Sequence, residues 1–211
     1  MIASKDRSGW FGASDVDKIV GNWNTKSWMD WWLVKMGVAR NDIETLAMNA
    51  GTHKEHQILE YVSPFMETDK QIIIEDLRLR INLDGNVGKH IYEVKTHSAE
   101  KVFKPSKKYI QQAMVQMYGF ETREADIVSY ALTEDDYKNY FLPIDPERLK
   151  YHPIAYDQKW IETIFLPRIE YLADCLIKGI LPDRERNGHE DNRKNSRCEH
   201  RLHNRQADAD P

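Results

Sequence analysis

Apolar and polar residues alternate in several short segments of the chain, and this pattern predicts a β-sheet of about five strands. The clearest case places Leu77, Leu79, Ile81 and Leu83 on one strand face. Other segments repeat their apolar residues every three to four positions, which predicts helices. The strands are expected at 70–76, 77–83, in a hairpin over 84–95, at 125–132 and at 138–144, and the helices at 14–21, 27–37, 39–62, 106–120 and 157–178. Pro167 is expected to kink or divide the last helix.

Residue types near the N-terminus refine this picture. Ser14, with an acid three residues later at Asp17, is typical of a helix N-cap. Trp28, Trp31 and Trp32 are spaced to share a face of the second helix. Because an amphipathic helix buries its apolar face, we interpret them as core side chains rather than as groups that stack on bases.

The composition predicts one globular domain followed by a polar tail. With 41% apolar and 30% charged residues, the 211-residue chain can bury a core, and we expect a single domain over 1–182. From Asp183 onward the sequence is almost wholly charged and polar, so 183–211 is predicted to be a disordered tail. Cys198, His200 and His203 lie close together there, but with no second cysteine nearby they do not match the usual zinc spacings.

The sequence also argues against several classes of protein. No apolar run is long enough to cross a bilayer, and the N-terminus lacks the apolar region of a signal peptide, so no membrane association is expected. Cys175 and Cys198 are far apart in unlike contexts, which favours a reducing cytoplasm and excludes a four-thiolate iron–sulfur cluster. The net charge of −4 argues against a uniformly basic nucleic-acid binder but allows a local basic groove for phosphates.

The segment 80–96 carries the strongest chemical signal. Asp84-Gly85 is expected to begin the turn of a hairpin, and Glu93 and Lys95 project from the same face of its second strand. Two carboxylates and one ammonium would then converge. Magnesium-dependent cleavage of phosphodiesters uses this set, because the hard cation takes carboxylate oxygens and the lysine can orient or deprotonate the attacking water.

The same segment also has a purely structural interpretation. Asp-Gly is among the commonest turn dipeptides, and Glu-x-Lys on one strand face is often a solvated ion pair. Residues elsewhere in the chain must therefore decide between a turn beside an ion pair and a catalytic site.

Two predicted helices and a loop near the hairpin carry further candidates. On the helix over 39–62, Gly51 allows a close approach to the backbone, and Glu55 lies one turn later on the same face. On the helix over 106–120, Tyr109 and Gln112 lie three residues apart and can sit side by side. The polar connection over 97–108 is usually a solvated loop, but here it is placed to meet a phosphate backbone. Its lysines are Lys101, Lys104, Lys107 and Lys108.

Taken in order, Glu55, Asp84, Glu93-Val94-Lys95 and Tyr109-Ile-Gln-Gln112 resemble the motifs of the PD-(D/E)XK nuclease superfamily, and within it the exonucleases of the phage lambda and YqaJ type. The resemblance covers most of residues 7–120, although Leu83 stands where the motif has a proline. It implies an α/β (α+β) fold with a restriction-endonuclease-like core, in which a mixed sheet of about five strands is flanked by helices.

The resemblance implies a metal site. Asp84 and Glu93 match the metal ligands, the backbone carbonyl of Val94 would complete the coordination, and Glu55 would contribute to a second ion or act through water. The implied cofactor is Mg²⁺, with one or two ions per site, and Mn²⁺ is expected to substitute for it.

Other matched residues are assigned to catalysis and to the DNA end. Lys95 matches the catalytic lysine, and Gln112 matches the helix glutamine that supports the site. Arg7 and Ser14 are similar in spacing to the segment that binds a terminal 5′-phosphate in the lambda-type enzymes, and a guanidinium suits that group. Met48 falls where those enzymes carry an apolar wedge that splits the first base pairs.

The implied function is a metal-dependent DNA exonuclease that digests duplex DNA from its ends, 5′ to 3′ and with a preference for a 5′-phosphate, in phage-type recombination. Tyr109, Lys101 and Lys104, together with Met48, are the expected further contacts to DNA. The resemblance also suggests a homotrimer, a single-strand annealing protein as partner, and a phage- or prophage-encoded protein in the cytoplasm of a bacterial host. The sequence itself shows neither the trimer nor the partner.

Two other functions remain open on the same core. A structure- or site-specific endonuclease would use the same acids, but Arg7 and Ser14 suit a chain end. A catalytically silent DNA-binding or assembly protein has no use for the intact set of Asp84, Glu93 and Lys95, because buried charges are costly to desolvate.

Overall fold

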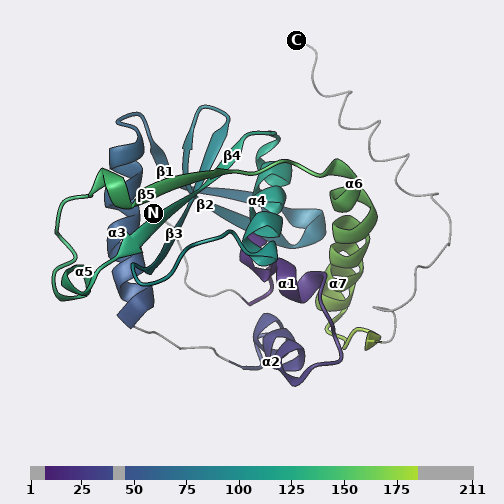
Figure 1. Cartoon of the computed structure of the whole chain (residues 1–211). Coiled ribbons are helices and arrows are strands. Elements are labelled where there is room, and N and C mark those ends of the chain that lie inside the picture. The colour runs from purple at the N-terminus through teal and green to yellow at the C-terminus, as the bar shows by residue number, and fades with distance from the viewer. Residues whose placement is uncertain (1–7, 40–45, 185–211) are drawn as a thin grey trace, which may run out of the picture.

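A computed structural model describes residues 8–39 and 46–184 of the protein, with side chains described from residue 51 in the second range. Within these residues, a five-stranded sheet is combined with helices that precede, interrupt and follow it (Figure 1). The strands are β1 (Glu67–Ile74), β2 (Leu79–Val87), β3 (His90–Ser98), β4 (Ala125–Leu132) and β5 (Leu149–Pro153). The helices are α1 (Val16–Ile19), α2 (Lys26–Lys35), α3 (Leu46–Val62), α4 (Lys107–Phe120), α5 (Glu134–Lys138), α6 (Gln158–Trp160) and α7 (Leu166–Lys178).

The sheet is mixed, and its strands lie side by side in chain order from β1 to β5. β3 and β4 pair in parallel, whereas the other neighbours pair antiparallel. The parallel pair requires a crossover connection, and α4 supplies it. The predicted α/β architecture, a mixed five-stranded sheet with flanking helices, is therefore confirmed.

Two apolar cores cover the two faces of the sheet. Ile58 and Leu59 of α3 form one cluster with apolar side chains of β3 and β4. The helices α1, α4 and α7 lie on the other side (Figure 1), where the second and larger cluster includes the buried tryptophans. Trp28 and Trp32 are each 1% exposed and their ring centroids are 5.6 Å apart, while Trp31 is partly buried against them. The interpretation of these tryptophans as core residues is confirmed.

The Asp84-Gly85 dipeptide lies inside β2 and not at the hairpin turn, so this part of the prediction is wrong. β2 continues beyond the dipeptide, and the turn is formed by Gly88, with φ of 56°, and Lys89. Gly85 serves packing instead, because a Cβ there would lie 2.7 Å from the side chain of Leu59. The carboxylate of Asp84 therefore projects from within β2, next to the backbone of β3, and not from the hairpin turn.

The strand predicted over 138–144 is also wrong. These residues form the end of α5 and the loop that follows it, and the fifth strand is β5. A cap explains the difference, because the carboxylate of Asp136 accepts the backbone N–H of Thr133 at 2.9 Å and so starts a short helix directly after β4. The predicted strand over 77–83 likewise begins later, since Leu77 ends a 3₁₀ turn, η2 (Glu75–Leu77), and remains buried.

Ser14 does not cap the first helix. Gly12 occupies the N-cap position of the 3₁₀ turn that precedes α1, and Asp15 occupies that of α1 itself; the backbone N–H of Gly12 donates to the carboxylate of Asp15 at 2.7 Å. Ser14 lies instead within the 3₁₀ turn η1 (Ala13–Asp15), which leads into α1. The acid that completes the cap is thus Asp15, which directly follows Ser14 and whose carboxylate accepts the N–H of the residue three positions earlier.

The predicted helix over 157–178 is confirmed in extent and is divided before Pro167. It consists of α6, a π-helical turn, η4 (Ile161–Phe165), and α7, and it ends at Gly179 with φ of 67°. Proline has no N–H to donate within a helix, and the widened turn directly before it accommodates that loss.

Some predicted features lie outside the described residues. They are Arg7, residues 40–45, the side chain of Met48, and residues 185–211 with Cys198, His200 and His203. Within the part of the chain that the structure describes, none of the helices is both long enough and apolar enough for a membrane span.

Candidate active site

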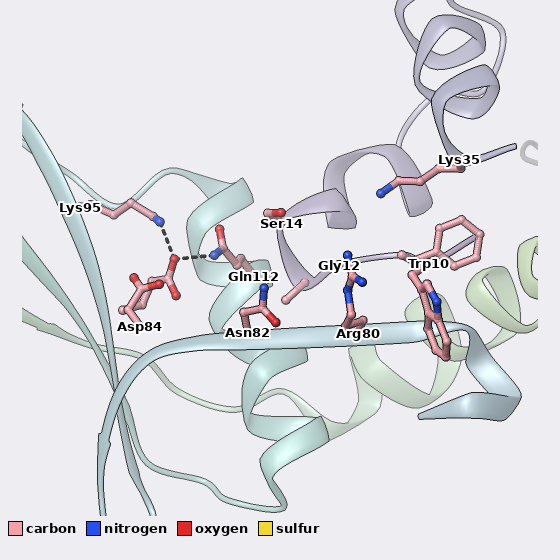
Figure 2. Close-up of a pocket in the computed structure, with 12 residues that line it drawn as sticks. Trp10, Gly12, Ser14, Lys35, Arg80, Asn82, Asp84, Lys95 and Gln112 are labelled. Atoms are coloured by element: carbon pink, nitrogen blue, oxygen red, sulfur yellow. Dashed lines mark hydrogen bonds and ion pairs between the residues drawn. The ribbon is translucent and has the colours of Figure 1, made fainter. Parts of the chain in front are cut away.

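A pocket of about 210 Å³ brings together Ser14, Asp84, Glu93, Lys95 and Gln112. The remaining residues that line it are Trp10, Phe11, Gly12, Ala13, Lys35, Arg80 and Asn82. Figure 2 shows Asp84 and Lys95 at one end of this pocket and the residues from the N-terminal segment and α2 at the other. Four of the five residues predicted to be catalytic therefore meet at one place, together with Ser14, one of the two residues predicted to bind a 5′-phosphate.

Glu93 lies at the centre of the acidic end and is 2% exposed. Its Oε1 accepts hydrogen bonds from Lys95 Nζ and Gln112 Nε2, and its Oε2 accepts one from Gln116 Nε2. Lys95 reaches this carboxylate because residues two apart in a strand share a face, and the two glutamines do so because residues four apart in a helix are neighbours. These donors offset the desolvation of the carboxylate and hold it in one orientation.

Asp84 is fixed by the backbone of β3. Its Oδ2 accepts the backbone N–H of Val94 at 2.9 Å, just beyond the pairing of residues 85–87 with residues 90–92. The side chain of Val94 is 6% exposed and packs in the α3 core, which fixes this N–H. The hydrogen bond keeps Asp84 beside Glu93, and a role for the Val94 carbonyl in metal binding stays a prediction.

Burial and neighbouring charges raise the pKa values of Asp84 and Glu55. Burial raises the pKa of Asp84 well above its usual range, and the charges of Glu93 and Glu55 raise it further. Burial also raises the pKa of Glu55, with the charge of Glu93 as the next cause. Burial disfavours the charged form of Lys95, but Glu93 and Asp84 outweigh it and raise the pKa of Lys95. The carboxylates thus repel one another around a lysine that is held as an ammonium.

Glu55 lies near this cluster but does not line the pocket. It is half-buried on α3, and its charge acts on Asp84. One turn earlier, a Cβ at Gly51 would lie 3.1 Å from Thr96 Oγ1, so α3 closely approaches β3 at this point. The close approach predicted at Gly51 is confirmed, and Glu55 is within electrostatic range of the acids.

The opposite end of the pocket is basic. Lys35, from the last turn of α2, is 2% exposed, and its Nζ lies 2.6 Å from Asp15 Oδ2. Asp15 also accepts the indole N–H of Trp31 at 2.9 Å, which fixes the pair. Arg80 rises from β2 toward this end, and Ser14 lies between the two ends (Figure 2). The pocket therefore has Asp84 and Glu93 at one end, and Arg80 with the Asp15-paired Lys35 at the other.

The donors at the acidic end fit a hard divalent cation. Asp84 and Glu93 supply carboxylate oxygens, and the repulsion among the acids is the charge pattern that such a cation relieves. Among the described side chains, no group of three His, Cys, Asp or Glu residues is arranged to hold an ion. An ion here would therefore take these two carboxylates and keep several water molecules, as Mg²⁺ usually does.

Sequence reasoning missed Gln116, Asn82, Arg80 and Lys35. Three of them carried a signal, because Gln116 lies four residues after Gln112 on α4, and Asn82 and Arg80 alternate with the buried residues of β2 as Asp84 does. Lys35 carried none, because only the docking of α2 against η1 places it at the pocket.

Of the residues predicted to contact DNA, Tyr109 lies at the acidic end and Lys101 and Lys104 lie in the loop that precedes its helix. The Tyr109 ring on α4 faces Lys95, with Nζ 5.2 Å from the ring centroid. Lys101 and Lys104 are exposed in the loop between β3 and α4. Their positions are compatible with a DNA strand beside the pocket, and contact with DNA stays a prediction.

Comparison with protein families gives one match over much of the chain. The model of the YqaJ-like viral recombinase domain matches residues 4–121, the segment that carries every residue lining the pocket. A comparison with curated proteins gives no match.

Solved structures share the fold. An alkaline exonuclease (LHK-Exo) from Laribacter hongkongensis has a TM-score of 0.58 at 23% identity, over 82% of this chain and 93% of that chain. The same exonuclease in complex with dAMP has a TM-score of 0.58 at 24% identity, over the same shares. A phage related exonuclease from Haemophilus somnus 129PT has a TM-score of 0.55 at 16% identity, over 80% of this chain and 95% of that chain. At these identities the likeness establishes the fold.

Proposed function

Because the chain belongs to the family of YqaJ-like viral recombinase domains, we propose that it is a metal-dependent deoxyribonuclease that digests duplex DNA from its ends. The observation that carries the proposal is the Glu93 carboxylate, which is 2% exposed, is held by three side-chain donors and lies beside Asp84 in a pocket. Acids crowded in this way cost stability, which supports a catalytic role over a purely structural one. The fold shared with two exonucleases supports the same function.

Asp84 and Glu93 would hold Mg²⁺, with Glu55 and the Val94 carbonyl as further ligands, directly or through water. When bound, the ion would polarise the phosphate and lower the pKa of a water molecule. Mn²⁺ is expected to substitute, since it accepts the same oxygen ligands.

The remaining residues of the site orient the Glu93 carboxylate and stabilise the reacting groups. Gln112 and Gln116 keep the Glu93 carboxylate in one orientation toward the pocket. Lys95, as an ammonium next to Glu93, can donate a hydrogen bond to the attacking water or to a phosphate oxygen that gains negative charge. Water attacks phosphorus, the bond to the 3′-oxygen breaks, and the leaving nucleotide takes a proton to form its 3′-hydroxyl.

The basic end of the pocket supports recognition of a 5′-phosphate. Lys35 and Arg80 supply positive charge, and Ser14 and Asn82 offer neutral donors between them and the acids. A phosphate at the basic end would direct the next phosphodiester toward the acidic end, and Arg7 is proposed to join this group. Because cleavage leaves a new 5′-phosphate on the shortened strand, such a pocket would bind each product as the next substrate, which favours 5′ to 3′ digestion.

The family also supports a biological setting. We propose a role in phage-type recombination, with a single-strand annealing protein as partner, a homotrimer as the assembled form, and the bacterial cytoplasm as the location. These proposals rest on family membership and not on a surface of this chain.

The test is digestion of linear duplexes labelled at either end, with and without a 5′-phosphate, in Mg²⁺. We expect loss of label from 5′-phosphorylated ends first, and no digestion by Lys95→Ala. The control is Lys138→Ala, which removes an exposed lysine of α5 and should act like the wild type. Digestion by Lys95→Ala at the wild-type rate would contradict the proposal.

Two further arms of the same experiment refine it. Arg7→Ala should slow digestion mainly of 5′-phosphorylated ends, and equal slowing of hydroxyl ends would count against the phosphate pocket. Nicking of closed circular DNA by the wild type would indicate an endonuclease, and binding without cleavage in any metal ion would indicate a catalytically silent protein.

A further inference from the structure

Lys95 has a second neighbour besides Glu93. Its Nζ lies 5.2 Å from the centroid of the Tyr109 ring, so the ammonium is held between a carboxylate and an aromatic face. The side chain of Lys95 is 20% exposed, and cation–π attraction strengthens when the cation is partly desolvated. The ring therefore contributes to where the ammonium sits.

The Tyr109 ring is in turn supported by Phe103. Phe103 belongs to the loop between β3 and α4, and its ring centroid lies 6.2 Å from that of Tyr109 at an interplanar angle of 13°. His97 and His152 also contact Phe103, each with ring centroids 5.2 Å away. Rings from β3, β5 and α4 thus hold one residue of the loop in place beside the site.

The loop that carries Phe103 also carries exposed basic residues. Lys101 and Lys104 flank Phe103 and are exposed, whereas Phe103 is half-buried. Ser106 ends the loop and caps α4, because its Oγ accepts the backbone N–H of Tyr109 at 3.3 Å. The loop is therefore joined to Tyr109 twice, by a ring contact and by a helix cap.

We propose that Tyr109 and Phe103 are positioning residues for Lys95 and that they link the basic loop to the acidic end of the pocket. Tyr109 holds the ammonium against Glu93, and Phe103 holds Tyr109. A DNA strand bound to the lysines of the loop would therefore affect the contacts of Phe103 with Tyr109 and of Tyr109 with Lys95. The inference rests on the proposed nuclease function and adds two residues that act through another side chain.

The kinetic test compares variants of the full chain on saturating duplex ends in Mg²⁺. We expect Tyr109→Leu to lower kcat by about tenfold with little change in KM, because it removes the cation–π contact. Tyr109→Phe keeps the ring and should retain kcat, and Phe103→Leu should lower kcat by about threefold. Tyr137→Leu, a surface tyrosine of α5, is the matched control and should leave kcat unchanged. A rise in KM at unchanged kcat in Tyr109→Leu would overturn the proposal in favour of a direct DNA contact.

A spectroscopic test needs neither metal ion nor DNA. The ε-methylene protons of Lys95 near the Tyr109 ring should show an upfield ring-current shift in NMR spectra of the metal-free protein, assigned by comparison with Lys95→Arg. The shift should persist in Tyr109→Phe and disappear in Tyr109→Leu. An unchanged Lys95 signal in Tyr109→Leu would overturn the positioning role. Because this measurement does not depend on digestion, failure of the proposed nuclease function would be recognised separately.

Discussion

Asp136 and Asp84 are two acids of the same protein whose surroundings move their pKa values in opposite directions. For Asp136, burial raises the pKa, but the backbone N–H of Thr133 and the guanidinium of Arg148 outweigh it, and the pKa is lowered. For Asp84, burial and the charge of Glu93 both raise the pKa, and it lies well above its usual range. The surroundings of Asp136 favour its ionised form, and those of Asp84 disfavour it.

The two acids differ in the number of cations next to them. Asp136 faces Lys54 Nζ at 3.3 Å and Arg148 Nη1 at 2.5 Å, and Arg148 Nε also contacts Asp145 at 3.2 Å, so the acids and cations of this group are matched in number. At the acidic end of the pocket, Asp84 and Glu93 share the ammonium of Lys95, and Glu55, which lies nearby, adds a third negative charge. A buried acid that is matched by cations stabilises the fold, whereas acids that outnumber the neighbouring cations are poised to bind another one.

The largest effect is expected for Asp84→Asn. Loss of this carboxylate should lower digestion in Mg²⁺ by about a thousandfold or more, since metal-ion catalysis contributes several kcal/mol. The same change should leave the metal-free protein as stable as the wild type or more stable, because it relieves repulsion with Glu93. Digestion assays and urea unfolding measure the two effects, and a large loss of stability would show that Asp84 resembles Asp136 after all.

Asp136→Asn should have the opposite profile. Breaking the contacts to Lys54 and Arg148 leaves Lys54 without its acid and Arg148 with Asp145 alone, and it should lower the free energy of unfolding by about 3 kcal/mol. The digestion rate per folded molecule should stay at the wild-type value. Circular dichroism during urea unfolding gives the stability, and the contrast between the two acids would be lost if Asp136→Asn abolished digestion while the protein stayed folded.

Gln116→Leu tests the support of Glu93 and should have a smaller effect. It removes the donor to Oε2 of Glu93 and should lower kcat by about tenfold to a hundredfold, the range usual for side chains that orient a metal ligand. Gln158→Leu, at an exposed position of α6, is the matched control. Equal kcat values for the two variants would mean that Lys95 and Gln112 suffice to hold the carboxylate.

The smallest effect is the dependence of stability on pH. The raised pKa of Asp84 means that its ionisation costs stability, and this cost is absent at low pH and grows as the pH rises through the folded-state pKa. Metal-free wild type should therefore lose stability relative to Asp84→Asn as the pH rises from about pH 4 to about pH 8.

The lowered pKa of Asp136 predicts the reverse slope. The stability that Asp136 provides is present above its unfolded-state pKa and is lost as the pH falls through its lower folded-state pKa. Denaturant unfolding in a chelator at several pH values measures both acids, and equal slopes for the variants of Asp84 and Asp136 would contradict the comparison.

Much of the fold and of the acidic end could be predicted because local patterns encode it. The alternation that buries Leu79, Ile81 and Leu83 was confirmed, as were the strand over 125–132 and the helix that carries Gln112. Glu93 and Lys95 meet because strand periodicity alone puts them on one face.

The errors arise where contacts distant in sequence override local preference. Asp84-Gly85 has the composition of a turn, but Gly85 is required by the packing of Leu59 against β2, so the strand continues. Lys35 reaches the pocket only through its pairing with Asp15, and Phe103 is fixed by rings from other elements. These positions depend on tertiary packing, which a local pattern does not contain.

The central claim is that the crowded acids beside Lys95 form a cation site, and thermal unfolding of the full chain in increasing Mg²⁺ tests it most directly. A ligand that binds the folded state stabilises it by RT ln(1 + [L]/Kd), so the wild type should show a saturable rise in Tm. Asp84→Asn should show little or no such rise, while Asp136→Asn, although less stable at the outset, should show the full rise. An equal response of the wild type and Asp84→Asn, or no response of either, would contradict the account.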